Sequence, residues 1–260
     1  MPAAPCGRLG RVRDHRVQQL AKLPQVEIFR ESPLDATQIL EFGFPHVVIA
    51  TGALWRRDGI ARYHLAAIPT GPGARILTPD DLMDGARPGG RIVIYDDDHY
   101  YMGGLMAELL VAEGAKVTLV TPASEPSNWA RNTLEQHKIQ ARLLTLGVAI
   151  ETNRALSRIE TGGVETACIF TGRRWEQAAD AVVLVTARLL REALYRDLLA
   201  RRADWAGAGL SSVRAIGDAW APSTIAAAVH AGRRYAEEFE EPRSPDAMPF
   251  RREVTALAAP

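Results

Sequence analysis

Three segments of the chain share one pattern, in which a short strand-like run that contains valine and isoleucine ends in small or polar residues. They are Val47–Gly52, Val182–Ala187 and Val213–Asp218. Continuous apolar runs of this length are typical of strands buried on both faces of a parallel sheet. Helical patterns lie between the runs, and strands that alternate with helices predict an α/β fold.

The first third of the chain predicts two helices and two strands. Apolar residues recur at helical spacing from Leu9 to Leu23, and Pro24 then ends that amphipathic helix. Further along the chain we expect a strand at Val26–Phe29, then a turn and a short helix at Pro33–Leu40, and then a buried strand at Val47–Ala50.

A segment rich in glycine and proline, Gly59 to Gly90, predicts loops and a domain boundary near Gly89. A β-α-β unit follows, with a strand at Ile92–Tyr95, a helix at Gly103–Glu113, a C-cap at Gly114 and a strand at Val117–Val120. The rest predicts a helix at Asn128–Lys138, strands at Val148–Thr152, Ala155–Ile159, Thr166–Phe170 and Ala181–Val185, a helix at Leu189–Arg202, a strand at Val213–Ile216, a helix at Ile225–Phe239 and an extended tail from Pro242.

The strand ends are the candidate binding site, because ligands of open α/β sheets lie beyond the carboxyl ends of the strands. Small residues there let a phosphate or ribose approach the backbone, and Asp218 can accept hydrogen bonds from ribose-type hydroxyls. Ser223 is expected to cap the following helix. For Asp218 the alternative is that it only caps a turn. The predicted cofactor-binding residues are Ala50, Thr51, Gly52, Gly217, Asp218 and Ser223.

Composition and charge exclude several classes of protein. The chain has 31 basic and 31 acidic side chains, so no net positive field attracts a nucleic acid. No apolar run approaches the roughly 18 residues that a membrane span needs. The Arg-rich N-terminus lacks a continuous apolar region, which excludes a secretory signal and leaves an organellar transit peptide as an alternative to a cytoplasmic location. Cys6 and Cys168 predict neither a disulfide framework nor a metal site.

No complete catalytic set is recognisable in the sequence. The nucleophile elbow, the Walker A loop, the zincin helix and the paired-cysteine motif are all missing. His15, His137 and His230 fall in charged helices, where solvated positions are expected. Trp55 and Trp220 follow two of the strand ends; we expect them to pack in the core, with stacking on an adenine as the alternative.

Taken together, the strand ends resemble the two-dinucleotide-binding-domain pattern of flavoproteins, from about Leu9 to Phe239. The resemblance is to the C-terminal FAD/NAD(P)-binding-like region of the trimethylamine, dimethylamine and histamine dehydrogenase group, which is related to Old Yellow Enzyme and 2,4-dienoyl-CoA reductase. Its most specific stretch is Tyr95–Gly104, supported by Arg56–Gly59. It implies a Rossmann-like fold with a partial ADP/FAD-binding-like domain at 1–88 and 190–260, and an inserted NAD(P)-binding-like domain at 89–189.

The inserted domain departs from the dinucleotide-binding pattern at its glycine-rich loop. If Gly103 takes the place of the third glycine, Asp98 and Tyr100 stand at the first two positions. A carboxylate repels a phosphate, and a tyrosine side chain blocks the close approach of backbone. We therefore predict that this domain does not bind NAD(P)H. There are two other interpretations of the Asp96–His99 segment. It is a solvated loop, or it forms a metal site from Asp96, Asp98 and His99.

The resemblance also implies parts that this sequence does not contain. The family carries FMN in an N-terminal barrel and a [4Fe-4S] cluster, yet a barrel alone takes about 250 residues. A four-iron cluster needs four thiolates, and the chain has two cysteines. The first glycine-rich βαβ unit is missing as well, which leaves a sheet edge unpaired. We expect a fragment, or a subunit that docks on a partner.

The expected function is that of the C-terminal nucleotide-binding portion of a flavin-dependent oxidoreductase of the amine dehydrogenase or N-demethylase type. It would hold ADP or FAD and support electron transfer from the FMN and [4Fe-4S] region, and the isolated chain would be inactive. Expected partners are the barrel region or a barrel subunit, and an electron-transfer flavoprotein. The alternatives are an NAD(P)H-dependent flavin oxidoreductase of the 2,4-dienoyl-CoA reductase type and a non-catalytic interaction subunit.

Overall fold

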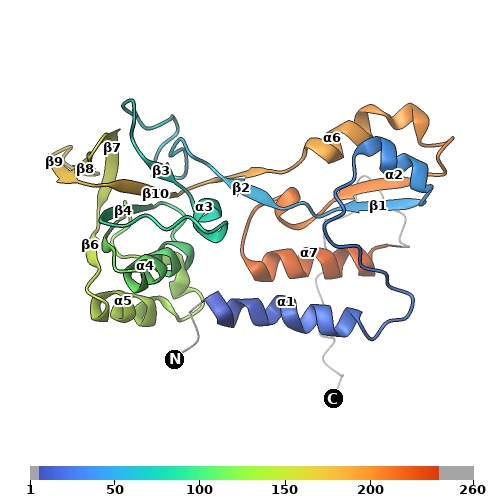
Figure 1. Cartoon of the computed structure of the whole chain (residues 1–260), viewed down its shortest axis with the longest axis horizontal. Helices are drawn as coiled ribbons and strands as arrows, with labels where there is room; N and C mark the ends of the chain where they lie inside the picture. The colour runs from blue at the N-terminus through green and yellow to red at the C-terminus, as the bar shows by residue number, and fades with distance from the viewer. Residues whose placement is uncertain (1–5, 240–260) are drawn as a thin grey trace, which may run out of the picture.

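Two lobes lie along the long axis of the molecule, and a ribbon of two short strands joins them (Figure 1). The computed structural model describes residues 6–239. A parallel sheet runs through the larger lobe, and helices alternate with its strands. The mixed α/β fold expected from the sequence is confirmed.

The large lobe is built on five parallel strands in the order β3-β10-β4-β5-β6. Every residue of β10 is buried, and so are five of the six residues of β4, because both faces of the sheet are covered. The continuous apolar run that predicted a buried strand at Ala181–Val185 is therefore explained. The strands are β3 (Ile76–Leu77), β4 (Arg91–Asp96), β5 (Lys116–Val120), β6 (Ala149–Glu151) and β10 (Ala181–Val185).

Helices cover one face of this sheet. Met106 and Leu110 of α4 belong to the same buried cluster as Ile92 and Ile94 of β4. Gly114, expected to end this helix, follows it with φ +88°, a left-handed conformation that glycine adopts without strain. The helices of the lobe are α3 (Pro79–Met83), α4 (Met102–Ala112), the 3₁₀ helix η1 (Asn128–Arg131) and α5 (Gln136–Thr145).

A small antiparallel sheet covers the other face. Its strands are β7 (Arg154–Glu160), β8 (Gly163–Cys168) and β9 (Arg174–Ala178). Leu156 and Val164 from this sheet join Val93 and Leu184 of the parallel sheet in a second buried cluster. The sequence did not predict β9, because its inward-facing residues Trp175 and Gln177 do not form an apolar pattern.

The small lobe pairs β1 with β12 in parallel and packs α2 and α6 against them. Ile49, Leu198, Trp205 and Val213 are at the centre of its core. Its elements are β1 (His46–Ile49), α2 (Ala36–Phe42), α6 (Ala193–Ala200), η2 (Arg202–Asp204), β12 (Ser212–Ala215), η3 (Gly217–Ala219) and α7 (Ile225–Glu237). No residue of α7 is buried.

The ribbon that joins the lobes consists of β2 (Ala53–Trp55) and β11 (Arg188–Leu190), which pair antiparallel. The helix expected at Leu189–Arg202 therefore starts later, at Ala193, because its first residues belong to the ribbon. The helix expected at Asn128–Lys138 is also divided. Leu134 has φ +60° between η1 and α5, and no helix passes through that conformation.

Residues that precede Gly89 pack in the large lobe. Ile76 and Leu77 of β3 pair with β10, and α3 packs on α4, so both elements belong to the large lobe. Gly89 only precedes β4 inside that lobe. The loop-rich segment before it thus contributes an edge strand that a two-residue apolar pattern could not predict.

The N-terminal helix is confirmed as α1 (Cys6–Leu20), which lies below α7 of the small lobe in the view of Figure 1. The strand expected at Val26–Phe29 is wrong: these residues pair with no other strand, and Phe29 is 74% exposed. A strand forms only beside another strand, and none is adjacent here among residues 6–239. The tail expected from Pro242 lies outside the described residues.

No helix in the described part of the chain is long and apolar enough to cross a membrane.

Candidate functional site

The carboxyl ends of β1 and β12 lie side by side, as the sequence predicted. The two strands pair in parallel register from His46 opposite Ser212 to Ile49 opposite Ala215. The Ile216 N–H then donates to the Ile49 carbonyl, 2.9 Å away. The Ala-Thr-Gly and Gly-Asp strand ends therefore meet at one edge. The third strand end, Thr186–Ala187, follows β10 in the large lobe and leads into the ribbon.

Two glycines shape this edge. Gly52 has φ +81° and Gly217 has φ +58°, and no atom lies close enough to either to clash with an added Cβ. Their role is thus conformational, since left-handed backbone strains any residue with a Cβ. Ala50 and Thr51 are exposed, but the Thr51 hydroxyl already donates to the Arg191 carbonyl at 2.5 Å. Its lone pairs stay available to accept from a ligand.

Asp218 does more than cap a turn. Its Oδ1 accepts from the Ser223 N–H at 3.1 Å, and its Oδ2 accepts from Arg188 Nη1 at 2.9 Å. Arg188 Nη2 also donates to the Ser223 carbonyl at 3.0 Å. Sequence reasoning missed Arg188, because the residue lies 30 positions before Asp218 and only the antiparallel ribbon brings the two together.

The expectation that Ser223 caps α7 is wrong. The N-cap is the next residue, Thr224, whose Oγ1 accepts from the Ala227 N–H at 3.3 Å. Ser223 is held by Asp218 through its backbone instead, so its hydroxyl is not engaged in capping. A threonine caps nearly as well as a serine, and the sequence alone did not separate the two neighbours.

A cavity of about 620 Å³ opens beside these residues, between β12 and α7. Ligand pockets usually measure about 300–1,000 Å³, so a nucleotide fits this volume. Trp220 is 64% exposed in its wall, which contradicts the expected packing role. Trp55 does pack, against the core of the large lobe. The residues in its wall that can contact a ligand include Tyr195, Arg214, Gly217, Trp220, Ser223 and His230.

Arg214 gives the cavity a positive wall. Its guanidinium carbon lies 5.6 Å from the ring centroid of Tyr235, and its Nη1 is buried with no hydrogen-bond partner. An unpaired buried donor is costly and is commonly satisfied by a ligand or water. His230, which the sequence placed on a solvated helix face, lines the same cavity. The wall thus offers cationic side chains, aromatic rings and the bare backbone of Gly217 to a ligand.

The β4–α4 junction of the large lobe is the second candidate site, and it is filled by the protein itself. Asp96 is completely buried, and its Oδ1 accepts from the N–H groups of Asp98 and His99 at 3.2 and 3.0 Å. The N–H groups of Asp97 and Asp98 both donate to the Val185 carbonyl. The loop after β4 therefore folds over the end of β10, where the strand order of the sheet reverses.

Burial raises the pKa of Asp96 to about 7. Burial also raises the pKa of Asp98, although Arg188 and Arg62 lower it. Tyr100, the other residue expected to block a dinucleotide, lies 5.8 Å from Trp129 between ring centroids. No group of three metal-ligating side chains occurs among the described residues, so the interpretation of Asp96, Asp98 and His99 as a metal site is not supported.

Asp97 and His99 also stabilise this junction. His99 Nε2 lies 3.1 Å from Asp97 Oδ1, and Asp97 Oδ2 accepts from the Tyr63 N–H at 2.8 Å. His64, on the same loop as Tyr63, has a lowered pKa because of burial. These groups hold the segment around Tyr63 against the large lobe, and none of them faces the cavity.

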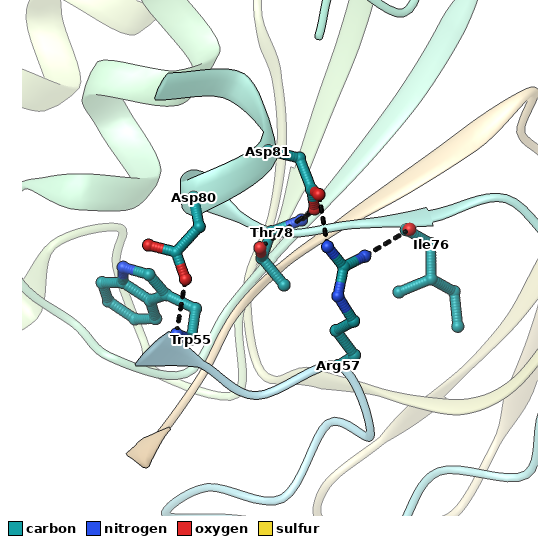
Figure 2. A network of polar contacts seen from close by, with 6 residues as sticks. All are labelled: Trp55, Arg57, Ile76, Thr78, Asp80 and Asp81. Atoms are coloured by element: carbon teal, nitrogen blue, oxygen red, sulfur yellow. Dashed lines mark hydrogen bonds and ion pairs between the residues drawn. The ribbon is translucent and has the colours of Figure 1, made fainter. Parts of the chain in front are cut away.

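The Arg56–Gly59 stretch has a structural role. Figure 2 shows Arg57 paired with Asp81 of α3 and donating to the Ile76 carbonyl, while Asp80 accepts from the Trp55 N–H at 2.8 Å. These contacts fix the ribbon to the large lobe, and the carboxyl group of Asp81 also bonds the Thr78 N–H at the start of α3.

Comparison with known proteins agrees with this architecture. Residues 77–181 match the family model described as the OYE-like second alpha/beta domain. Across 94% of its length the chain is 32% identical to dimethylamine dehydrogenase from Hyphomicrobium sp. (strain x), and it covers 36% of that protein.

Two solved structures are similar throughout. Histamine dehydrogenase from Rhizobium sp. 4-9 superimposes with a TM-score of 0.90 and 50% identity, over 96% of this chain and 39% of its own. The 6-hydroxypseudooxynicotine amine oxidase from Pseudomonas geniculata N1 gives 0.84 and 40%, over 89% of this chain and 34% of its own. The chain is thus related to dimethylamine and histamine dehydrogenases, and it spans little more than a third of their length.

Proposed function

We propose that this relative of the amine dehydrogenases is the nucleotide-binding portion of a flavin-dependent oxidoreductase, and that it holds ADP or the adenylate part of FAD in its small lobe, beside β12 and α7. The observation that carries the proposal is the meeting of the Ala-Thr-Gly and Gly-Asp strand ends beside a cavity of nucleotide size. The similarity to dimethylamine and histamine dehydrogenases supports the reaction class.

The residues present suit a nucleotide. Gly217 brings bare backbone to the cavity, and the Asp218 carboxylate has lone pairs left to accept from ribose hydroxyls. Arg214 and His230 supply positive or polar partners for phosphate oxygens, and the exposed ring of Trp220 can stack on a base. In this proposal Thr51 and Gly52 line the approach from β1.

The redox chemistry lies elsewhere in the proposed enzyme. FMN would supply oxidation of a C–N bond, and a [4Fe-4S] cluster would carry electrons onward. The two cysteines of this chain do not fit such a cluster, so both groups belong to a barrel region or barrel subunit. We propose that region as the partner of this chain, with an electron-transfer flavoprotein as the acceptor of electrons.

We propose that the large lobe is the inserted NAD(P)-binding-like domain of a two-dinucleotide-binding-domain fold, and that it does not bind NAD(P)H. A pyrophosphate needs free N–H groups at the start of α4, and the Asp96 side chain and the loop over β10 already occupy that region. This separates the proposal from a 2,4-dienoyl-CoA reductase type of enzyme, which takes hydride from a nicotinamide cofactor.

Isothermal titration calorimetry with ADP, FAD and NADH tests the proposal on the 260-residue chain. ADP or FAD should bind and NADH should not. Tight binding of NADH, or binding of none of the three, would overturn the assignment. The matched variant is Asp218→Asn, which keeps the size of the side chain but removes its charge, and it should weaken ADP binding. Asp84→Asn, a change remote from both strand ends, serves as the control.

A further inference from the structure

Arg188 occupies the point where the ribbon, the small lobe and the large lobe meet. It is the first residue of β11 and stands opposite Trp55 in the antiparallel pair. Its guanidinium carbon lies 5.0 Å from the centroid of the Trp55 ring, and its side chain is 17% exposed. A planar guanidinium held against an aromatic ring has few orientations left, so its hydrogen bonds are fixed in direction.

These hydrogen bonds close one short segment at both ends. Nη1 donates to Asp218 and Nη2 donates to the carbonyl of Ser223, while the Ser223 N–H returns to Asp218. The segment between them carries Trp220 and follows Gly217, both in the wall of the cavity. Removing the guanidinium would leave only the Ser223 N–H to orient the Asp218 carboxylate.

The same cation also acts on the large lobe. The positive charge of Arg188 lowers the pKa of Asp98, although burial raises it more. Arg188 also lowers the pKa of Tyr101, against the larger effect of burial, and the Tyr101 oxygen hydrogen-bonds the backbone of Ile225 at the start of α7. The loop after β4 therefore faces the segment that Arg188 organises.

From this geometry we propose that Arg188 is the positioning residue of the nucleotide site: it orients the Asp218 carboxylate toward the ligand hydroxyls and holds the 218–223 segment in its binding conformation. The inference rests on the proposed function, because it assigns a role within that site. Arg188 itself does not touch the ligand. Its effect on affinity passes through Asp218 and Ser223.

The test is calorimetric titration of the full chain with ADP, for wild type, Arg188→Ala and Arg188→Lys. Loss of a buried, hydrogen-bonded charge should weaken binding about 10- to 100-fold in Arg188→Ala. Arg188→Lys, which keeps the charge but lacks the planar fork, should bind with intermediate affinity. Arg91→Ala is the matched control, because Arg91 pairs with Asp180 at the amino ends of β4 and β10 in the large lobe and should leave ADP affinity unchanged.

Chemical rescue distinguishes positioning from a general loss of folding. Guanidinium chloride at non-denaturing millimolar concentration should restore part of the ADP affinity of Arg188→Ala and none of that of Asp218→Ala. If Arg188→Ala fails to fold, the Lys variant decides: unchanged affinity overturns the inference. Normal ADP binding by both Arg188 variants overturns it while leaving the proposed function intact. No ADP or FAD binding by the wild-type chain overturns the proposed function and the inference together.

Discussion

The carboxyl group of Asp96 lies directly against Gly103 in the first turn of α4. A Cβ added to Gly103 would stand 2.5 Å from Asp96 Oδ2, closer than any real contact. By its position in the sequence, Gly103 corresponds to the third glycine of a dinucleotide-binding loop. Close packing between strand and helix requires a glycine at that position. In this lobe the close neighbour is an acidic side chain of the protein.

Gly103→Ala should therefore destabilise the large lobe. Asp96 is completely buried and cannot move aside, so overpacking should lower the free energy of unfolding by about 1–3 kcal/mol. Urea denaturation followed by circular dichroism measures this. Gly232→Ala is the matched control, since Gly232 is also helical but has open space around its Cα, and it should be stabilising by roughly 0.5–1 kcal/mol. A neutral Gly103→Ala would contradict the described packing.

The stability of the protein should fall as the pH rises from about 4 to about 7. Burial raises the pKa of Asp96 from 3.8 to about 7, so the folded state holds a proton in this range that the unfolded state has lost. Comparing wild type with Asp96→Asn isolates the effect, because the amide does not ionise and retains an oxygen for the N–H groups of Asp98 and His99.

The free energy of unfolding of Asp96→Asn, relative to wild type, should rise by about 3–4 kcal/mol between pH 4 and pH 8. Thermal melts at intervals of one pH unit are sufficient to follow the change. A constant difference between the two proteins would mean that Asp96 is ionised throughout this range, and its burial would then need another explanation.

Nucleotide binding should change the fluorescence of Trp220. This indole is 64% exposed in the wall of the cavity, whereas Trp55 and Trp205 are packed in the two lobes. ADP should quench and shift the emission of the wild-type chain, and Trp220→Phe should abolish most of the signal while calorimetry still detects binding. A signal that survives in Trp220→Phe would place the nucleotide elsewhere.

The amide hydrogen of Val48, on the edge of β1 that faces away from β12, should exchange rapidly with solvent. The carbonyls of Pro45 and Ile49 accept from β12, so the alternation of a strand turns the N–H of Val48 to the other edge, where no described residue accepts it. Hydrogen exchange measured by NMR should show Val48 faster than Ile49. A partner that supplies a parallel strand would slow Val48, and equal rates in the isolated chain would contradict this description of the edge.

Much of the architecture follows from local pattern. The apolar runs at β4, β5 and β10 predicted strands of a parallel α/β sheet, because a strand buried on both faces needs no alternation. The two strand ends at Thr51 and Gly217 could be assigned to one site for the same reason, since parallel strands bring their carboxyl ends to one edge.

Other parts depend on pairing between distant segments, which no local pattern contains. Val26–Phe29 has the composition of a strand but lacks a neighbour, while Ile76–Leu77 is too short to predict and becomes a strand beside β10. Arg188 reaches Asp218 only because the ribbon returns the chain to the small lobe.

Thus the sequence by itself determined the buried strands of the parallel sheets, most of the helices and the residue types at the edge of the small-lobe sheet, because hydrophobic periodicity and glycine conformation are local properties. Tertiary structure alone decided which polar groups are engaged: Asp96 inside the large lobe, Asp218 with Arg188, and Trp220 free in the cavity wall. Burial and hydrogen bonding depend on what the fold places next to a side chain, and that neighbour is usually far away in the sequence.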